Sequence, residues 1–194
     1  MPKAGRYTGV AIGLHWATAG LVLVNIPLAL THDWVSHSVG PAMMWWHKSL
    51  GLTVLALIPL RLLWRLAHPP PAPPPAMRRW ETFAAAVTHW GFYALLIALP
   101  LTGWALSSAV PRDTPIPLYG AVWPYFPGVH NLPLAQRHAL HGQLQVWHAW
   151  LAWAVCALLA LHVGAYLKHA LVNKDDIPGR MTPWPRRART AAVS

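Results

Sequence analysis

The stretch WHAWLAWAVCALLALHVGAYL, residues 147–167, decides the fold. It contains no charged residue, and it places His148 fourteen residues before His162. Fourteen residues of α-helix make about four turns, so both imidazoles project from the same face of one helix. Their separation along the helix axis is about 21 Å, roughly two-thirds of the hydrocarbon core of a bilayer. Because a histidine inside a membrane is costly, a functional role is the default hypothesis for both residues.

The overall composition indicates an integral membrane protein. Of the 194 residues, 55% are hydrophobic and only 10% are charged, and the mean hydropathy is +0.34. A soluble domain carries about 25% charged residues. The net charge of +10 does not indicate nucleic-acid binding, because the basic residues cluster at the ends of apolar segments and not on one soluble face. The single cysteine, Cys156, excludes a disulfide and a cysteine-based zinc or iron–sulfur site.

Four apolar segments are each long enough to span a bilayer, namely residues 10–30, 47–66, 84–107 and 146–167. The predicted fold class is therefore all-α, an integral membrane four-helix transmembrane bundle that forms one domain over residues 1–194. The proline-rich stretch HPPPAPPPAMRRW (68–80) is predicted to be non-helical, and a second loop is predicted over residues 110–143. The prolines inside the first three segments, Pro27, Pro59 and Pro100, are expected to be accommodated as kinks.

The basic residues predict the orientation of the bundle in the bacterial inner membrane. Twelve lie in or beside the N-terminus, the second connection and the C-terminus: Lys3, Arg6, Arg61, Arg65, Arg78, Arg79, Lys168, Lys174, Arg180, Arg186, Arg187 and Arg189. Only three lie on the opposite side, namely Lys48, Arg112 and Arg137. The positive-inside rule therefore places both termini in the cytoplasm, including a basic cytoplasmic tail over residues 181–194.

This orientation gives each histidine of the spans a depth. His15 and His162 lie near the inner surface, whereas His47 and His148 lie near the outer surface. His89 lies at the same inner depth, so depth alone allows three inner pairings. The other histidines outside the C-terminal segment are assigned to loops, where a solvated surface role is the default: His32, His37, His68, His130, His138 and His141.

Two imidazoles that face each other in an apolar bundle are the axial ligand set of a six-coordinate b-type haem. Zinc would need four nitrogen, sulfur or carboxylate ligands, and the interior of the spans offers no carboxylate and one thiol. Gly51, one turn after His47, and Gly164, beside His162, would let a flat macrocycle approach a helix. The alternative for any one of these histidines is a simple hydrogen bond to a neighbouring helix.

Five motifs carry a resemblance to a known family. They are GLHW (13–16), WWHKSLG (45–51) followed by RLLWR (61–65), THWGFYALLIALPLTGW (88–104), WHAWLAWAVCALLALH (147–162) and YLKHALVNKDDIPGRMTP (166–183). With these motifs, which cover nearly the whole chain in order, the protein resembles the bacterial cytochrome b561 family. The wider group includes the di-haem cytochrome b subunits of nickel–iron hydrogenases and formate dehydrogenases.

The resemblance implies a cofactor set and a ligand set. It implies two haem b groups, one held by His15 and His162 and the other by His47 and His148, and it leaves His89 outside the ligand set. Arg61 and Arg65, at the inner end of the second span, are candidates to bind the haem propionates. The alternative for the two arginines is that they are positive-inside anchors only.

Three functions are compatible with this sequence. In the first, the chain is an oxidoreductase that passes electrons from a small diffusible donor to membrane quinone, as family members that oxidise superoxide and reduce ubiquinone do. Lys48, Arg112 and Arg137 would then give the outer side a mildly positive mouth that steers an anion. In the second, the chain is a membrane anchor that relays electrons between quinone and a separate dehydrogenase or soluble cytochrome.

The third function is a non-redox histidine bundle, such as a proton or metal transporter, which the absence of an intramembrane Asp or Glu disfavours. No Gly-rich phosphate loop is present, so a nicotinamide or flavin site is not expected. The partners that we expect are membrane lipid, ubiquinone or a related quinone, and a small or protein electron donor.

Overall fold

The computed structural model describes residues 5–75, 77–110 and 114–183. Its four long helices are α1 (Gly9–Thr31), α2 (Gly40–Ala67), α3 (Arg79–Ser108) and α4 (Leu134–Leu167). Each is long and apolar enough to cross a membrane, so the predicted all-α, four-helix membrane bundle is confirmed. Most of the predicted basic tail, residues 184–194, lies outside the described residues.

Shorter elements connect these helices or follow them. They are η1 (His32–Trp34), the strands β1 (Ile116–Leu118) and β2 (Ala121–Trp123), η2 (Lys168–Asn173) and η3 (Ile177–Arg180). The three prolines predicted to lie within helices, Pro27, Pro59 and Pro100, lie inside α1, α2 and α3.

The helices are longer than the apolar segments from which they were predicted. Helix α4 begins at Leu134, so residues 134–143 are helical and the prediction of a loop reaching residue 143 was wrong. His138 and His141 consequently lie on α4 and not in a loop. Hydropathy detects only the part of a helix that sits in lipid, and the first turns of α4 are too polar to register.

The proline-rich connection is also shorter than predicted, because Arg79 and Trp80 already belong to α3. The backbone N–H of Arg78 donates to Glu81 Oε2 at 3.0 Å, which satisfies one of the free donors at the start of this helix. The boundary of the predicted non-helical stretch therefore moves from residue 80 to Arg78.

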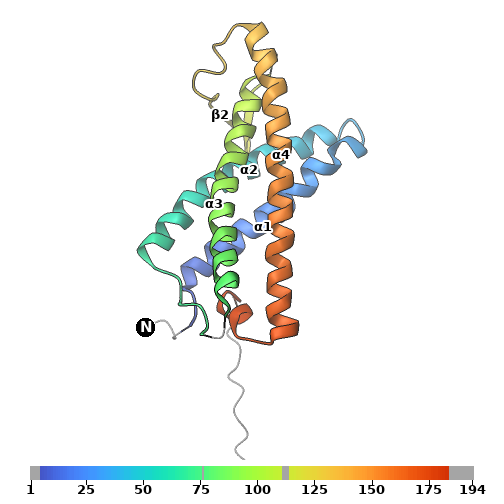
Figure 1. Cartoon of the computed structure of the whole chain (residues 1–194). Helices are drawn as coiled ribbons and strands as arrows, with labels where there is room; N and C mark the ends of the chain where they lie inside the picture. The colour runs from blue at the N-terminus through green and yellow to red at the C-terminus, as the bar shows by residue number, and fades with distance from the viewer. Residues whose placement is uncertain (1–4, 76, 111–113, 184–194) are drawn as a thin grey trace, which may run out of the picture.

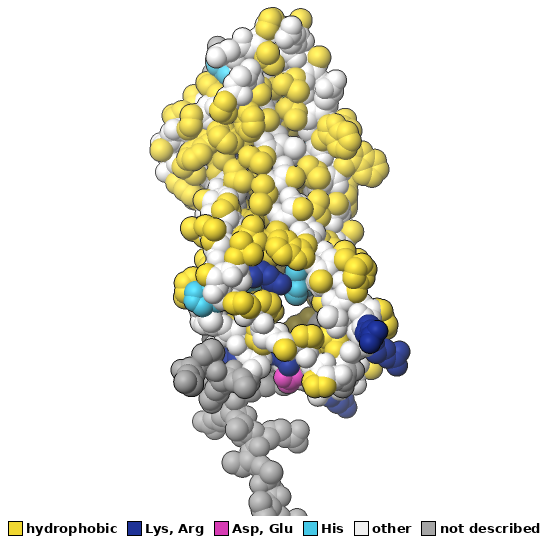
Figure 2. Space-filling view, turned by 60° about the vertical axis from the view of Figure 1, so that its left-hand side comes forward, with side chains coloured by type: hydrophobic (Ala, Val, Ile, Leu, Met, Phe, Trp, Pro, Cys, Tyr) yellow, Lys and Arg dark blue, Asp and Glu magenta, His cyan; other side chains and the backbone are white. Residues whose placement is uncertain are grey.

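The helices pack as two pairs, α1 on α2 and α3 on α4, which meet mainly where α2 contacts α3 (Figure 1). The buried core is small and lies at this junction, and its members are Val54, Ile58, Tyr93, Leu96 and Val155. Large apolar side chains such as Leu23, Leu63 and Trp150 are exposed instead. Hydrophobic side chains cover most of the face in Figure 2, and the Lys, Arg and acidic side chains gather toward one end. This distribution suits helices that face lipid.

The N-terminal residues, the proline-rich connection and the C-terminal segment meet at one end of the bundle (Figure 1). Trp16 Nε1 donates to the carbonyl of Met181 at 2.8 Å, and Tyr7 N donates to the carbonyl of Arg180 at 3.3 Å. Arg180 also donates to the carbonyl of Ala72 at 2.7 Å. We call this the inner end, because the positive-inside rule predicts that it faces the cytoplasm, and we call the opposite end the outer end.

At the outer end, β1 and β2 form a short antiparallel hairpin that is tied to two of the helices. Ser49 of α2, whose side chain is fully buried, donates to the carbonyl of Pro117 and accepts from Tyr119 N. On α3, Ser108 Oγ accepts from Phe126 N at 2.8 Å. These hydrogen bonds fix the outer connection against the helix ends, a feature that the sequence analysis did not predict.

Candidate functional site

The histidines of each predicted pair lie side by side. At the inner end, the ring centroids of His15 on α1 and His162 on α4 are 6.2 Å apart. At the outer end, the centroids of His47 on α2 and His148 on α4 are also 6.2 Å apart. One helix, α4, thus supplies one histidine to each of two layers. That these four side chains are metal ligands stays a prediction.

Each histidine pair bridges α4 and one helix of the α1–α2 pair. His162 meets α1 and His148 meets α2, yet α4 has little direct packing against either helix. Side chains, and not closely packed backbones, therefore occupy the space between the two helix pairs. A flat group inserted there would separate few existing helix–helix contacts.

The ring separation fits two imidazoles that bind the same metal ion from opposite sides. A bond from a metal to an imidazole nitrogen is about 2.0 Å long, so two such rings in line have centroids about 6 Å apart. Both measured separations are 6.2 Å. Among the described residues, no group of three or more His, Cys, Asp or Glu side chains is placed to hold a metal ion. Paired histidines without further donors suit a metal that brings its remaining ligands with it, as haem iron does.

The two outer histidines are held in one orientation by their second ring nitrogens. His47 Nδ1 lies 3.2 Å from the backbone carbonyl of Asn25, which can only accept, so Nδ1 carries the proton. His148 Nδ1 lies 3.1 Å from Thr102 Oγ1, whose own proton is donated to the carbonyl of Leu99. His148 Nδ1 is therefore also the donor. Both rings keep Nε2 unprotonated, and this support by an outer partner is usual for metal-binding histidines.

The inner pair is arranged differently, because Arg61 lies 2.8 Å from His15 Nδ1. A guanidinium has donors only, so His15 Nδ1 accepts and its Nε2 carries the proton. Binding of a metal through Nε2 thus requires Arg61 to release this ring. The guanidinium carbons of Arg61 and Arg65 lie 5.7 and 6.0 Å from the centroid of the Tyr93 ring. Neither arginine forms an ion pair with a described carboxylate, so both charges are available to an anionic group.

His89 lies as close to His162 as His15 does. Its ring centroid is 6.1 Å from that of His162, and the Phe92 ring lies 5.5 Å from His162 on the same helix as His89. The three inner histidines therefore form one cluster. The ring separations do not decide whether His15 or His89 is the partner of His162. The exclusion of His89 from the ligand set stays a prediction.

We expect His89→Ala to retain the haem content of the wild type, because His15 remains opposite His162 and can complete the inner pair. If each histidine pair holds one haem, the visible spectrum of the variant should match that of the wild type, while the midpoint potential of the haem at the inner pair shifts. A pyridine haemochrome assay combined with a potentiometric titration measures both quantities. Loss of one haem in this variant would place His89 in the ligand set.

The backbone of α3 closely approaches the His148 ring at Gly103. A Cβ atom at this position would lie 2.9 Å from His148 Cε1, so any larger residue would push the imidazole aside. The glycines predicted from the sequence are looser, since a Cβ on Gly51 would lie 3.7 Å from Asn25 Nδ2 and one on Gly164 would meet nothing within 4 Å. A Cβ atom would therefore fit at both positions, and the role expected of Gly51 and Gly164 stays a prediction.

The sequence analysis missed Asn25, Thr102 and Gly103. Asn25 is an amide in an otherwise apolar span, and its buried Oδ1 has no hydrogen-bond partner among the described residues. Thr102 and Gly103 are adjacent small residues that lie two and three positions after Pro100. An amide in an apolar helix and a threonine–glycine pair were the available signals in the sequence. Neither signal indicates which histidine these residues contact, because that depends on how the helices pack.

One of the three basic residues expected to attract an anion at the outer end, Arg137, is not an open charge. Arg137 is only 8% exposed and donates to the carbonyl of Val110, so it stabilises the outer connection and does not face solvent as an open charge. Arg112 lies outside the described residues. Lys48, next to His47, is half-buried and pairs with no described carboxylate. Of the two basic residues of this set that the structure describes, Lys48 is therefore the candidate to attract an anion.

The comparison with known proteins identifies the family of this chain. The pattern that describes the prokaryotic cytochrome b561 proteins matches residues 6–184. The chain is 32% identical over 182 residues to cytochrome b561 homolog 2 of Escherichia coli (strain K12), covering 91% of this chain and 90% of that protein. It is 30% identical over 181 residues to the probable superoxide oxidase CybB of Yersinia pestis, covering 93% and 98%.

The four apolar helices and these relatives define the class, a multi-pass b-type cytochrome of the bacterial inner membrane. The chain belongs to the prokaryotic cytochrome b561 family.

Proposed function

We propose that this cytochrome binds two haem b groups and transfers electrons from superoxide at its outer end to ubiquinone in the membrane. The observation that carries the proposal is the presence of one histidine pair near each end of the bundle, both with a member on α4. A relative of nearly the same length is named a probable superoxide oxidase, which supports the choice of donor.

The residues that would hold the haems are those of the two pairs, His15 with His162 and His47 with His148. When bound, the haem groups supply the one-electron chemistry that protein side chains lack. The carbonyl of Asn25 orients His47. At the inner end, the guanidinium groups of Arg61 and Arg65 would bind the propionates, which gives Arg61 an acceptor in place of His15.

The core keeps the region between the two pairs dry. Val155 lies seven residues from both His148 and His162 on the same face of α4 and is 1% exposed. It packs with Val54, Ile58, Tyr93 and Leu96. A close-packed apolar layer of this kind excludes water and ions from the middle of the bundle.

The overall reaction balances as two superoxide anions, one ubiquinone and two protons giving two dioxygen molecules and one ubiquinol. Each superoxide loses one electron and needs no bond to a protein group. A positive charge beside the outer pair would therefore act on the encounter rate alone. Lys48 lies next to His47 and is the described cation placed to do so.

The test is stopped-flow mixing of the oxidised protein with superoxide, followed by addition of ubiquinone. We expect superoxide to reduce the cytochrome rapidly and ubiquinone to reoxidise it, and we expect the first rate to fall as ionic strength rises. Lys48→Gln should weaken that salt dependence. Lys174→Gln, which removes a charge just beyond the inner end of α4, is the matched control and should leave it unchanged.

If superoxide reduces the protein slowly while a reduced quinone or a partner protein reduces it rapidly, the chain is an electron relay and the proposed donor is wrong.

A further inference from the structure

The histidine face of α4 continues beyond the inner pair. Positions 141, 148, 155, 162 and 169 are spaced by seven residues, and four of these five positions are histidine. Seven residues are about two helical turns, so side chains at this spacing share a face. His169 therefore lies about 10 Å beyond His162 toward the inner end, on the face that carries the predicted ligands.

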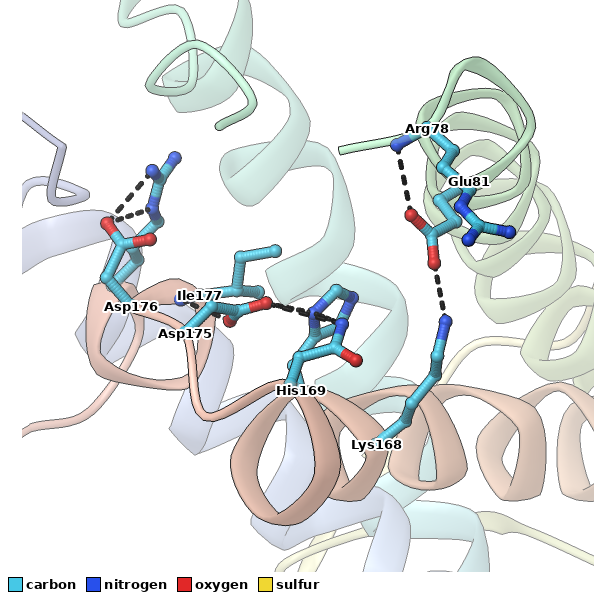
Figure 3. Close-up of polar contacts among 9 residues, drawn as sticks. Arg78, Glu81, Lys168, His169, Asp175, Asp176 and Ile177 are labelled. Atoms are coloured by element: carbon cyan, nitrogen blue, oxygen red, sulfur yellow. Dashed lines mark hydrogen bonds and ion pairs between the residues drawn. The ribbon is translucent and has the colours of Figure 1, made fainter. Parts of the chain in front are cut away.

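His169 is a buried side chain with a carboxylate partner. It lies in η2, the π-helical turn that ends α4, and its Nδ1 is 2.6 Å from Asp175 Oδ2 (Figure 3). Lys174 has a φ of 52°, the left-handed conformation, which reverses the chain and brings Asp175 back over the helix end. Asp175 Oδ1 accepts from Ile177 N at 3.1 Å, so the carboxylate is held on both sides.

The pair spans the boundary between water and the protein interior. The side chain of Asp175 is 29% exposed, whereas that of His169 is 10% exposed. Burial by itself would raise the pKa of Asp175, but the hydrogen bonds from His169 and from Ile177 N outweigh it and hold the pKa below its usual value. A carboxylate that stays ionised at neutral pH can draw a proton from water to the imidazole behind it.

The charged groups around this pair are already engaged with each other. Glu81 at the start of α3 pairs with Lys168, and Asp176 pairs with Arg180 (Figure 3). Asn173 Nδ2 is a further polar neighbour, 3.1 Å from His169 Nδ1 and 3.5 Å from Asp175 Oδ2. His169 and Asp175 therefore form the carboxylate–imidazole pair of this cluster, distinct from its two ion pairs between carboxylates and cations.

We propose that His169 and Asp175 deliver protons from the inner aqueous side to quinone that is reduced near the inner histidine pair, an inference that rests on the proposed function. Reduction of one quinone to quinol takes up two electrons and two protons. As an imidazolium whose Nδ1–H donates to Asp175, His169 would give up the proton at Nε2 and become neutral. Water from the inner side would then return one proton to Nε2, because the Asp175 carboxylate stabilises the protonated ring, and this cycle would run once for each proton. The electrons come from superoxide, so no further reductant is required.

A structural role of the pair as a helix cap is the alternative, and variants of the full-length, haem-loaded protein separate the two. We expect His169→Ala and Asp175→Asn to leave the reduction of the cytochrome by superoxide at the wild-type rate. Reoxidation by ubiquinone should slow by about 100-fold, since general acid catalysis contributes roughly 10²- to 10⁴-fold. Added imidazole should restore most of the rate in His169→Ala and none in Asp175→Asn.

Asp176→Asn is the matched control, because this neighbouring carboxylate pairs with Arg180 and does not contact His169. It should reoxidise like the wild type. Visible spectra and midpoint potentials of all variants report whether the haem sites are intact. Asp175→Asn keeps an oxygen that can accept from Ile177 N, so the helix end can fold as in the wild type.

The outcomes are distinguishable. If ubiquinone does not reoxidise the wild-type protein, the proposed function fails and the proton-delivery role fails with it. If the wild type is reoxidised and His169→Ala matches it, only the present inference is wrong. A slow His169→Ala that imidazole does not rescue shows a structural role and also overturns the inference.

Discussion

His148→Ala should remove one of two haem groups and leave the other unchanged. His148 is the α4 member of the outer pair, 6.2 Å from His47 between ring centroids. Another histidine at the outer end, His32, is engaged elsewhere, through Nδ1 with the carbonyl of Ala29 and through Nε2 with Asp33. A single axial histidine cannot supply the bis-histidine ligand set, so the haem content should fall to half. His47→Ala should have the same result, and His15→Ala or His162→Ala should remove the other haem.

Potentiometric titration with visible spectra is the appropriate measurement, since it identifies which haem remains. His47→Ala and His148→Ala should leave the same component, with one potential, and His15→Ala and His162→Ala should leave the other. His141→Ala is the matched control, because His141 lies seven residues before His148 on the same face and contacts the carbonyl of Leu106. If His15→Ala and His148→Ala left the same component, the pairing would be wrong.

The second large effect is expected for Gly103→Val. A Cβ atom at Gly103 would lie 2.9 Å from His148 Cε1 and 3.4 Å from its Nδ1, so a branched side chain must displace the ring. Overpacking alone costs about 1–3 kcal/mol. The displaced ring would also lose its hydrogen bond to Thr102 and its alignment with His47. We expect loss of the outer haem, or conversion of its spectrum from low-spin to high-spin, with the inner haem retained.

Electron paramagnetic resonance of the oxidised protein reports this change directly. Gly20→Ala on α1 is the control, because a Cβ there meets nothing within 4 Å. It should preserve both low-spin signals. Two unchanged low-spin signals in Gly103→Val would show that His148 does not need its present position.

The number of spans and the grouping of the histidines into two layers could be predicted from the sequence because both depend on distance along a single helix. His148 and His162 share one face of α4 because of their spacing alone. The distribution of basic residues predicts which of the two histidine layers is nearer the cytoplasm. The limits of the predicted spans were less accurate, since the polar first turns of α4 carry no hydropathy signal. Arg137, predicted to be an open charge, is buried because it donates to the carbonyl of Val110, a contact across the outer connection that its place in the sequence does not indicate.

The partners of the histidines could not be predicted because each contact crosses between helices. Asn25 reaches His47 from α1, and Arg61 reaches His15 from α2. Their identity depends on how the helices are rotated against each other, which one sequence does not specify. For His89, even the fold does not decide whether it pairs with His162, since its ring is as near to His162 as that of His15.

The measurement that tests the central claim most directly is the haem content of the purified wild-type protein by the pyridine haemochrome assay. The two histidine pairs predict two haem b groups per chain. A value of one haem per chain, or of none, would contradict the account.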